Sequence, residues 1–177
     1  MGKKAEIIEL ANRLLQERGV GSLSFRELAK SLGIKSSSVH YYFPQKDDLI
    51  DAIAEQYSEG MFALLAQRTE DIKGGKEKLN ALIDMIHEHI EDRLCTAGIL
   101  AAESAYISEQ TRDRVEKFFG SLFSWVEACL TEMGKGENEA NMLAGVILTA
   151  IEGSLMIDSI RGESYYLERL KDFIATL

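Results

Sequence analysis

Apolar residues recur every three to four positions along most of the chain, the spacing that places them on one face of an α-helix. In residues 3–18, Ile7, Leu10 and Leu14 share such a face, and Gly19 is a suitable residue to end the helix. The sequence shows no run in which apolar and polar residues alternate, as they do in a half-buried strand. The pattern therefore predicts an all-α protein with about nine helices.

Glycine, proline and capping residues set the boundaries of the predicted helices. Ser24 and Glu27 have the spacing of a capping box at the start of the second helix. Pro44 ends the third helix, because proline disfavours helical geometry in the residue before it. The fourth helix is expected over residues 47–68, and a glycine-containing linker over residues 73–76. The remaining helices are expected over residues 76–93, 96–105, 109–133, 138–160 and 163–175.

The second and third helices are joined by a tight turn at Gly33, and with the first helix they match a helix-turn-helix unit. The third helix begins with three serines, whose small size lets a helix N-terminus approach a DNA backbone closely. Val39 and Phe43 are four residues apart, so we expect them to share its buried face. Ordinary three-helix packing is the alternative interpretation. The candidate DNA contacts are Lys35, Ser36, Ser37, Ser38, His40, Tyr41, Tyr42 and Lys46.

Charge is distributed unevenly along the chain. Residues 1–46 hold eight Lys or Arg and four Glu, a net charge of +4, whereas the rest of the chain holds 12 cations and 25 anions, a net charge of −13. The acidic part would be repelled by DNA, so nucleic-acid contact should be confined to the basic part. We therefore expect a DNA-binding domain at residues 1–46 and a second domain with a different partner at residues 47–177, linked by the helix at 47–68.

The segment FRELAKSLGIKSSSVHYYFPQKDDL, residues 25–49, resembles the DNA-binding head of the TetR family of bacterial transcription regulators. Ala29, Gly33 and Ile34 fit the family pattern Ala-x-x-x-Gly-Val, with isoleucine in the valine position. A short recognition helix, a tyrosine-rich end, and then a lysine followed by acids keep the family's spacing. The resemblance covers about residues 3–65.

The resemblance implies a homodimeric repressor in the cytoplasm that binds a palindromic double-stranded operator and releases it when a small molecule binds the C-terminal domain. It also adds Ser24 and Arg26 to the expected DNA contacts. The chain departs from the family at His40, where tyrosine is common, and at Gln45, where serine is common. His40 can still donate to a phosphate, more strongly when protonated, whereas glutamine is a poorer N-cap than serine.

Aromatic residues and methionines gather in the acidic part of the chain, and such side chains can line an adaptable apolar pocket. The effector expected for such a pocket is small and apolar or aromatic. Each of these residues also has helical spacing and is a candidate core residue. The predicted pocket consists of Tyr57, Met61, Phe62, Met85, His89, Tyr106, Phe119, Phe123 and Trp125.

The last two predicted helices carry more apolar surface than one core needs, which favours a contact with a second copy of the chain. Burial inside one chain is the alternative. The expected dimer contacts are Leu143, Ile147, Ile151, Leu155, Tyr166, Leu170 and Phe173.

Other classes of function find less support. His87 and His89 are two residues apart on a helix and cannot easily share a metal, and the sequence has neither a glycine-rich phosphate loop nor a serine-nucleophile motif. We therefore expect no catalysis, metal or cofactor, and no apolar run approaches the length of a membrane span. Cys95, beside a predicted helix start and near Arg93, leaves a thiol-based redox or electrophile sensor as the alternative function. A helical adaptor that binds only protein is a further alternative.

Overall fold

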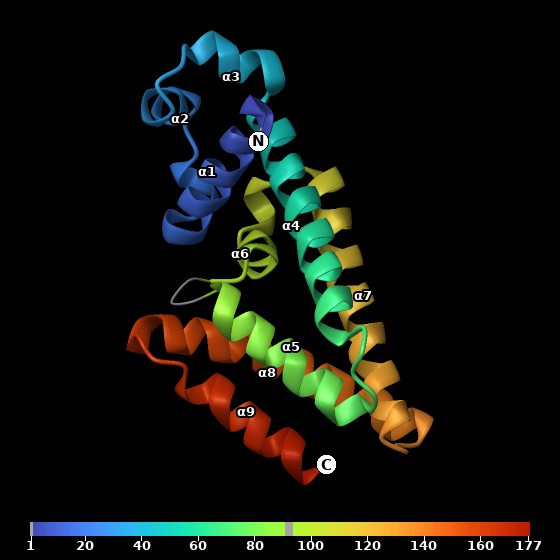
Figure 1. The fold of residues 1–177 in the computed structure, drawn as a ribbon. Coiled ribbons are helices and arrows are strands. Elements are labelled where there is room, and N and C mark those ends of the chain that lie inside the picture. Colours follow the sequence, from blue (N-terminus) through green and yellow to red (C-terminus); the bar gives the residue numbers. More distant parts are fainter. Residues whose placement is uncertain (1, 91–93) are drawn as a thin grey trace. The chain divides into compact units, whose positions relative to one another are not determined.

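The computed structural model describes residues 2–90 and 94–177 (Figure 1). These residues form nine α-helices and two short 3₁₀ helices and contain no strand, which confirms the predicted all-α fold. The elements are α1 (Lys3–Arg18), η1 (Val20–Ser22), α2 (Phe25–Ser31), α3 (Ser36–Tyr42), α4 (Lys46–Thr69), α5 (Gly75–Ile90), α6 (Thr96–Ala102), η2 (Ser104–Tyr106), α7 (Glu109–Glu132), α8 (Glu137–Arg161) and α9 (Tyr165–Thr176).

Most predicted helix boundaries agree with the structure within two residues. The expected linking helix is one continuous helix, α4, which begins at Lys46. The predicted helix at residues 96–105 was too long, because α6 ends at Ala102 and η2 follows it. The end of the helix predicted at residues 76–93 falls on residues 91–93, which lie outside the described part of the chain.

One predicted capping motif is absent at the start of α2. Ser24 is the N-cap residue but makes no side-chain capping bond, and Glu27 instead pairs with Arg18, at 3.1 Å between Nη1 and Oε1. The predicted capping box is therefore wrong, because the Glu27 carboxylate forms an ion pair with Arg18 of α1. The start of α7 does have a side-chain cap, since the Ser108 hydroxyl accepts the N–H of Thr111 at 3.2 Å.

The glycines between α4 and α5 allow a close approach of two helices. Gly74 has φ 110°, a left-handed conformation that favours glycine. Gly75 is the buried first residue of α5, and a Cβ atom there would lie 1.8 Å from the carbonyl oxygen of Cys129 in α7. The predicted linker is therefore partly helical, and its second glycine is a packing requirement.

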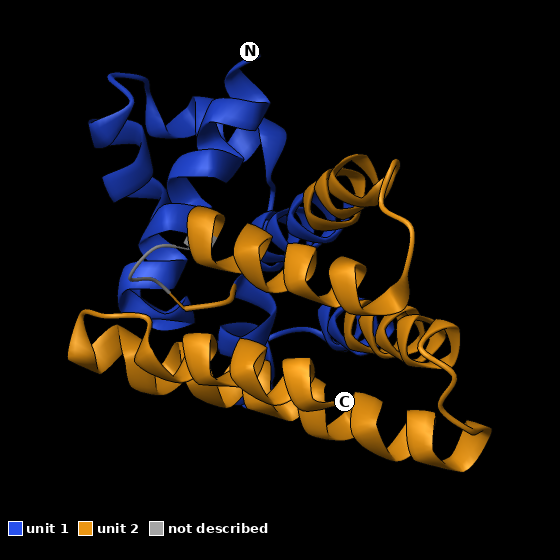
Figure 2. Cartoon of the chain, turned by 60° about the horizontal axis from the view of Figure 1, so that its bottom comes forward, with its two compact units in different colours: residues 1–59, 96–117 blue, residues 60–95, 118–177 orange. Residues whose placement is uncertain are grey.

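The chain forms two compact units, shown in different colours in Figure 2. Unit 1 comprises residues 1–59 and 96–117, and unit 2 comprises residues 60–95 and 118–177. The division falls inside α4 and α7 and not after residue 46. The reason is that the start of α7 bonds to the first part of α4, as in the hydrogen bond from Gln110 Nε2 to Asp51 Oδ2 (2.8 Å) and the ion pair between Arg114 and Asp51 (2.7 Å). Helix α6 in turn bonds to α1 through Thr96 and Asn12.

In unit 2, α8 packs against α9, and α9 packs against α5. Lys171 of α9 joins Asp84 of α5 in an ion pair of 2.7 Å. By length and composition, α8 would also suit a membrane span, contrary to the expectation from the sequence. Ile147 and Ile151 on its inner face are buried in unit 2, as in the core helix of a water-soluble fold.

Candidate DNA interface and effector domain

Helix α3 presents polar side chains to solvent and buries its apolar side. Val39 and Phe43 are 0 % and 2 % exposed, which confirms the predicted shared face. Ser38 is half-buried. The remaining side chains of α3 and its N-cap residue are exposed: Lys35, Ser36, Ser37, His40, Tyr41 and Tyr42.

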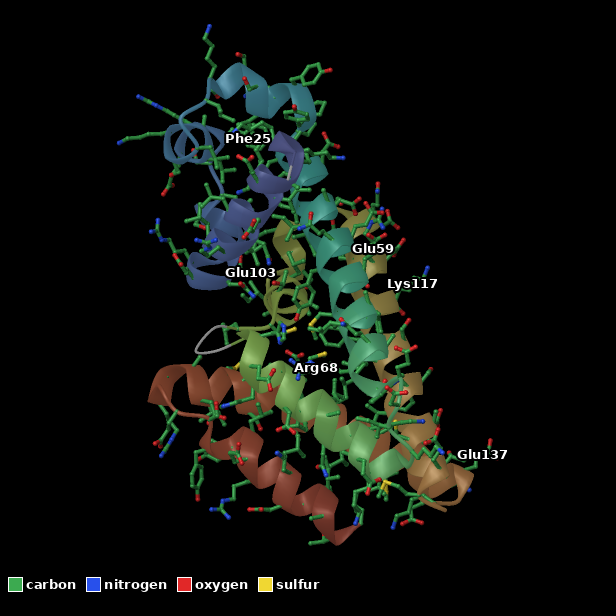
Figure 3. All side chains as sticks on the ribbon, viewed as in Figure 1. Phe25, Glu59, Arg68, Glu103, Lys117 and Glu137 are labelled. Atoms are coloured by element: carbon green, nitrogen blue, oxygen red, sulfur yellow. The ribbon has the colours of Figure 1, made fainter. Side chains whose placement is uncertain are left out.

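Aromatic contacts fix the orientation of the C-terminal half of α3. The His40 ring packs edge-on against Phe25, the first residue of α2, with 4.7 Å between centroids; Figure 3 labels Phe25. The Tyr41 and Tyr42 rings meet edge-on at 5.2 Å. Tyr41 is 80 % exposed, so its hydroxyl is free to contact a phosphate or a base edge.

The helix-turn-helix carries uncompensated positive charge. Arg26, Lys30 and Lys35 are exposed and form no ion pair with another described residue. The exposed face of α2 and α3 therefore attracts a polyanion. The cations of α1, by contrast, already have partners: Lys3 with Glu6, Arg13 with Glu9, Arg18 with Glu27, and Lys4 over the ring of Phe43.

The start of α4 differs from the prediction in one contact. Lys46 is half-buried, and its Nζ donates to the carbonyl oxygen of Val20 at 2.8 Å. One of its three N–H bonds is thus committed inside unit 1. The weak N-cap residue Gln45 is compensated by Asp48, whose carboxylate accepts the Gln45 N–H at 2.8 Å.

Several residues of the predicted effector pocket lie together in unit 2. The Phe62 and Phe118 rings are 5.6 Å apart, and Phe118 and Phe119 are 5.3 Å apart. Phe123 lies against α8, because a Cβ added at Gly145 would be 3.8 Å from its ring. Met85 is fully buried, and the other predicted residues of unit 2 on α4 and α7 are half-buried: Met61, Phe62, Phe119, Phe123 and Trp125.

The other three residues predicted for the pocket differ in exposure or belong to the other unit. His89 is exposed on α5, with its Nδ1 3.0 Å from the carbonyl oxygen of Met85. Tyr57 and Tyr106 belong to unit 1, and Tyr106 is 75 % exposed. The place of His89 and Tyr106 in the pocket stays a prediction, because helical spacing alone does not reveal which face of a helix is covered.

An open groove of about 570 Å³ in unit 2 contains none of the residues predicted for the pocket. Three of its six lining residues are glutamates and none is aromatic, unlike the lining predicted for an aromatic effector. The residues that line it are Ser124, Glu127, Ala128, Thr131, Glu132 and Glu137.

The predicted dimer contacts are divided between the surface and the core. Tyr166 and Phe173 of α9 are each 38 % exposed. The other five predicted residues are buried inside unit 2, and their contact with a second chain stays a prediction: Leu143, Ile147, Ile151, Leu155 and Leu170. A different face of α8 is exposed and apolar, and it carries Met142, Val146, Met156, Ile157 and Ile160.

Both cysteines are buried, at 4 % exposure for Cys95 and 2 % for Cys129. Burial raises the pKa of the Cys129 thiol to about 11. Cys95 hydrogen-bonds Glu152, whose carboxyl pKa is raised by burial and partly lowered again by that bond. Burial and a neighbouring carboxyl both disfavour a reactive thiolate at Cys95. Arg93, which favoured the thiol-sensor alternative, lies outside the described residues.

Two family profiles match most of the chain. The profile of the bacterial regulatory proteins of the tetR family matches residues 7–53. The profile of the LmrA/YxaF-like transcriptional regulator C-terminal domain matches residues 76–172.

Similar proteins match between 62 % and 99 % of the chain. The HTH-type transcriptional regulator YxaF of Bacillus subtilis is 27 % identical over 159 residues, covering 87 % of this chain and 83 % of that protein. The transcriptional repressor KstR2 of Mycobacterium tuberculosis is 26 % identical over 110 residues, covering 62 % of this chain and 55 % of that protein. The crystal structure of a TetR transcriptional regulator from Legionella pneumophila superposes with a TM-score of 0.94 at 26 % identity, covering 99 % of this chain and 97 % of that one.

Proposed function

Because the chain belongs to the TetR family of bacterial transcriptional regulators, we propose that it is a repressor that binds a palindromic operator as a homodimer and releases it when a small molecule binds. The observation that carries the proposal is the exposed, polar and cationic face of the helix-turn-helix. Proteins of this family are regulators and not enzymes, and they act on DNA in the bacterial cytoplasm. DNA binding is assigned to residues 1–46, and effector binding and dimerisation to residues 47–177.

In this proposal, α3 enters the major groove and its N-terminal residues approach the DNA. Lys35, Ser36 and Ser37 contact phosphates or base edges, because they are exposed at the start of the helix. His40 and Tyr41 extend the contact toward the C-terminal end of α3. Ser24, Arg26, Ser38, Tyr42 and the remaining N–H bonds of Lys46 contribute to the same surface.

A homodimer supplies two such heads to the two halves of a palindrome. The exposed apolar face of α8, together with Tyr166 and Phe173 of α9, supports pairing with a second copy, because large apolar residues on one exposed face mark an association surface. Two recognition helices of a dimer fit half-sites whose centres lie about 34–36 Å apart, or a multiple of that distance.

A small apolar or aromatic effector fits the aromatic cluster of unit 2. Met61 and Phe62 lie on α4, the helix that begins beside the DNA-binding domain at Lys46. An effector that prefers one position of α4 would change the spacing of the two heads, and a coupling of about 1–3 kcal/mol is enough for regulation. Phe119, Phe123 and Trp125 of α7 and the buried Met85 of α5 are the other residues assigned to the proposed pocket.

Salt-dependent DNA binding tests the proposed interface. A random-sequence 30-base-pair duplex is titrated with the wild-type protein, Lys35→Ala and the control Lys73→Ala, which removes an exposed charge outside the head. We expect Lys35→Ala to weaken binding and to reduce the slope of log K against log salt concentration by about 1, as the loss of one phosphate contact does. Lys73→Ala should match the wild type. If the two variants had the same DNA affinity and the same salt slope, Lys35 would not be a DNA contact.

A further inference from the structure

Val20, at the corner between α1 and α2, is held by hydrogen bonds at both of its backbone groups. Its N–H donates to Glu103 Oε2 at 3.0 Å, and its carbonyl oxygen accepts from Lys46 Nζ at 2.8 Å. The Val20 side chain is only 2 % exposed. Glu103, labelled in Figure 3, follows α6 and lies 83 residues further along the chain, far outside the helix-turn-helix. A residue from outside the DNA-binding domain therefore fixes its first corner.

The preceding residue, Gly19, shows how closely Glu103 approaches the backbone. Gly19 has φ 76° and ψ 176°, a conformation that is essentially restricted to glycine. A Cβ atom added there would lie 2.3 Å from Glu103 Oε1. One carboxylate oxygen thus packs against the Cα of Gly19 while the other accepts the Val20 N–H. The corner is shaped to receive this carboxylate.

A second hydrogen bond holds α6 along α1. The Thr96 hydroxyl, at the start of α6, donates to Asn12 Oδ1 at 2.8 Å, and Thr96 is fully buried. Thr96 and Glu103 are seven residues apart, and their partners Asn12 and Val20 are eight residues apart. Each of these separations corresponds to about two turns of a helix. They follow the same order along both segments, so α6 is attached to α1 at two points and cannot pivot about one.

The corner is linked by short steps to the proposed DNA-contacting surface. The corner is separated from α2 by only three residues, Ser22, Leu23 and Ser24. Within this short segment, Ser22 Oγ donates to the carbonyl oxygen of Gly19 at 2.8 Å. Phe25 at the start of α2 packs against His40 of α3. A displacement of the corner would therefore displace α2 and, through Phe25, the exposed face of α3.

We propose that Glu103 is a positioning residue for operator binding, which acts through Val20 and Gly19 and does not contact DNA. This inference rests on the proposed function, because it names a residue outside the head that sets the fit of the head to its site. The carboxylate gives charge-assisted strength to the bond with the Val20 N–H. Lys46 holds the same residue from its carbonyl side, so Lys46 shares this positioning role.

The test compares Glu103→Ala, Glu103→Gln and Glu116→Ala, a control that removes an exposed acidic side chain of unit 1. The probes are a duplex selected by the wild-type protein from a randomised library and an unselected random-sequence duplex. We expect Glu103→Ala to bind the selected duplex about tenfold more weakly, the effect of losing one hydrogen bond to a charged group. Binding to the unselected duplex and the salt slope should not change.

The conservative variant distinguishes positioning from charge. Glu103→Gln keeps an oxygen acceptor for the Val20 N–H, so we expect it to bind the selected duplex within about twofold of the wild type. Glu116→Ala should match the wild type. The proposal is overturned if Glu103→Ala keeps wild-type affinity, if it loses both duplexes equally, or if Glu103→Gln fails as badly as Glu103→Ala.

Hydrogen exchange of the Val20 amide, measured on the full chain without DNA, separates this inference from the proposed function. Exchange should be about tenfold faster in Glu103→Ala and return to the wild-type rate in Glu103→Gln. Unchanged exchange in Glu103→Ala would overturn the contact itself. A wild-type protein that selects no sequence would overturn the proposed function and the positioning role together, even if the Val20 amide responds as expected.

Discussion

Residues only two positions apart at the end of α3 have opposite environments. Val39 is fully buried and Phe43 nearly so, whereas Tyr41 between them is 80 % exposed. The sequence predicts this division because the spacing of apolar residues defines the buried face of a short helix. It does not predict that Lys46 donates to Val20 or that Glu27 pairs with Arg18, since both bonds depend on how separate segments meet.

At the residue scale, we expect neither cysteine to react with iodoacetamide in the folded protein at pH 8. With a pKa of about 11, only about one Cys129 thiol in a thousand is ionised at that pH, and Cys95 is 4 % exposed. Mass spectrometry should find both cysteines modified only after unfolding in guanidinium chloride. Rapid alkylation of Cys95 in the folded protein, with loss of DNA binding, would instead favour a thiol sensor.

The sequence predicts where the helices begin and end more reliably than which side of each helix is buried. Apolar spacing and breaker residues locate most helices within two residues, because these signals are local. The end of α6 was missed, since the chain continues there as η2 without a breaker residue. The close contact of Gly75 with Cys129 could not be predicted, because it joins residues 54 positions apart.

This contact gives a prediction at the scale of the element. Gly75→Ala should lower the free energy of unfolding by about 1–3 kcal/mol or more, because the added Cβ meets backbone of α7 that cannot move aside as a side chain would. The matched control is Gly120→Ala in α7, where nothing lies within 4 Å, and alanine should raise the free energy of unfolding by about 0.5–1 kcal/mol. Urea denaturation of both variants measures the difference. If both variants changed the free energy of unfolding in the same direction, the close packing of Gly75 against Cys129 would be contradicted.

At the scale of the whole molecule, the sequence indicates an association surface on the last two helices but does not tell which face of α8 is exposed. Apolar residues lie on more than one side of this helix, and periodicity does not tell which side faces the core. The structure buries Ile147 and exposes its neighbour Val146, at 46 %. The family resemblance, by contrast, could be found from residues 25–49 alone, because the motif is contiguous.

The adjacent residues Val146 and Ile147 give a matched pair of variants. We expect the wild-type protein to be a dimer of about 40 kDa, twice the 19.8 kDa chain, and Val146→Glu to be a folded monomer, because its charge falls on the exposed apolar face. Ile147→Glu should unfold the chain, since it places a charge in the core. Light scattering gives the mass and circular dichroism the helix content. A Val146→Glu variant that remains a dimer would place the association surface elsewhere.

The most direct test of the central claim is the sequencing of genomic DNA fragments that the purified protein retains. We predict that the retained fragments share an inverted repeat whose half-sites are centred about one helical turn of DNA apart, or a multiple of one turn, because two copies of α3 must fit the major groove together. Fragments retained in the same proportions as in the starting material, or a single unrepeated motif, would contradict a dimeric operator-binding repressor.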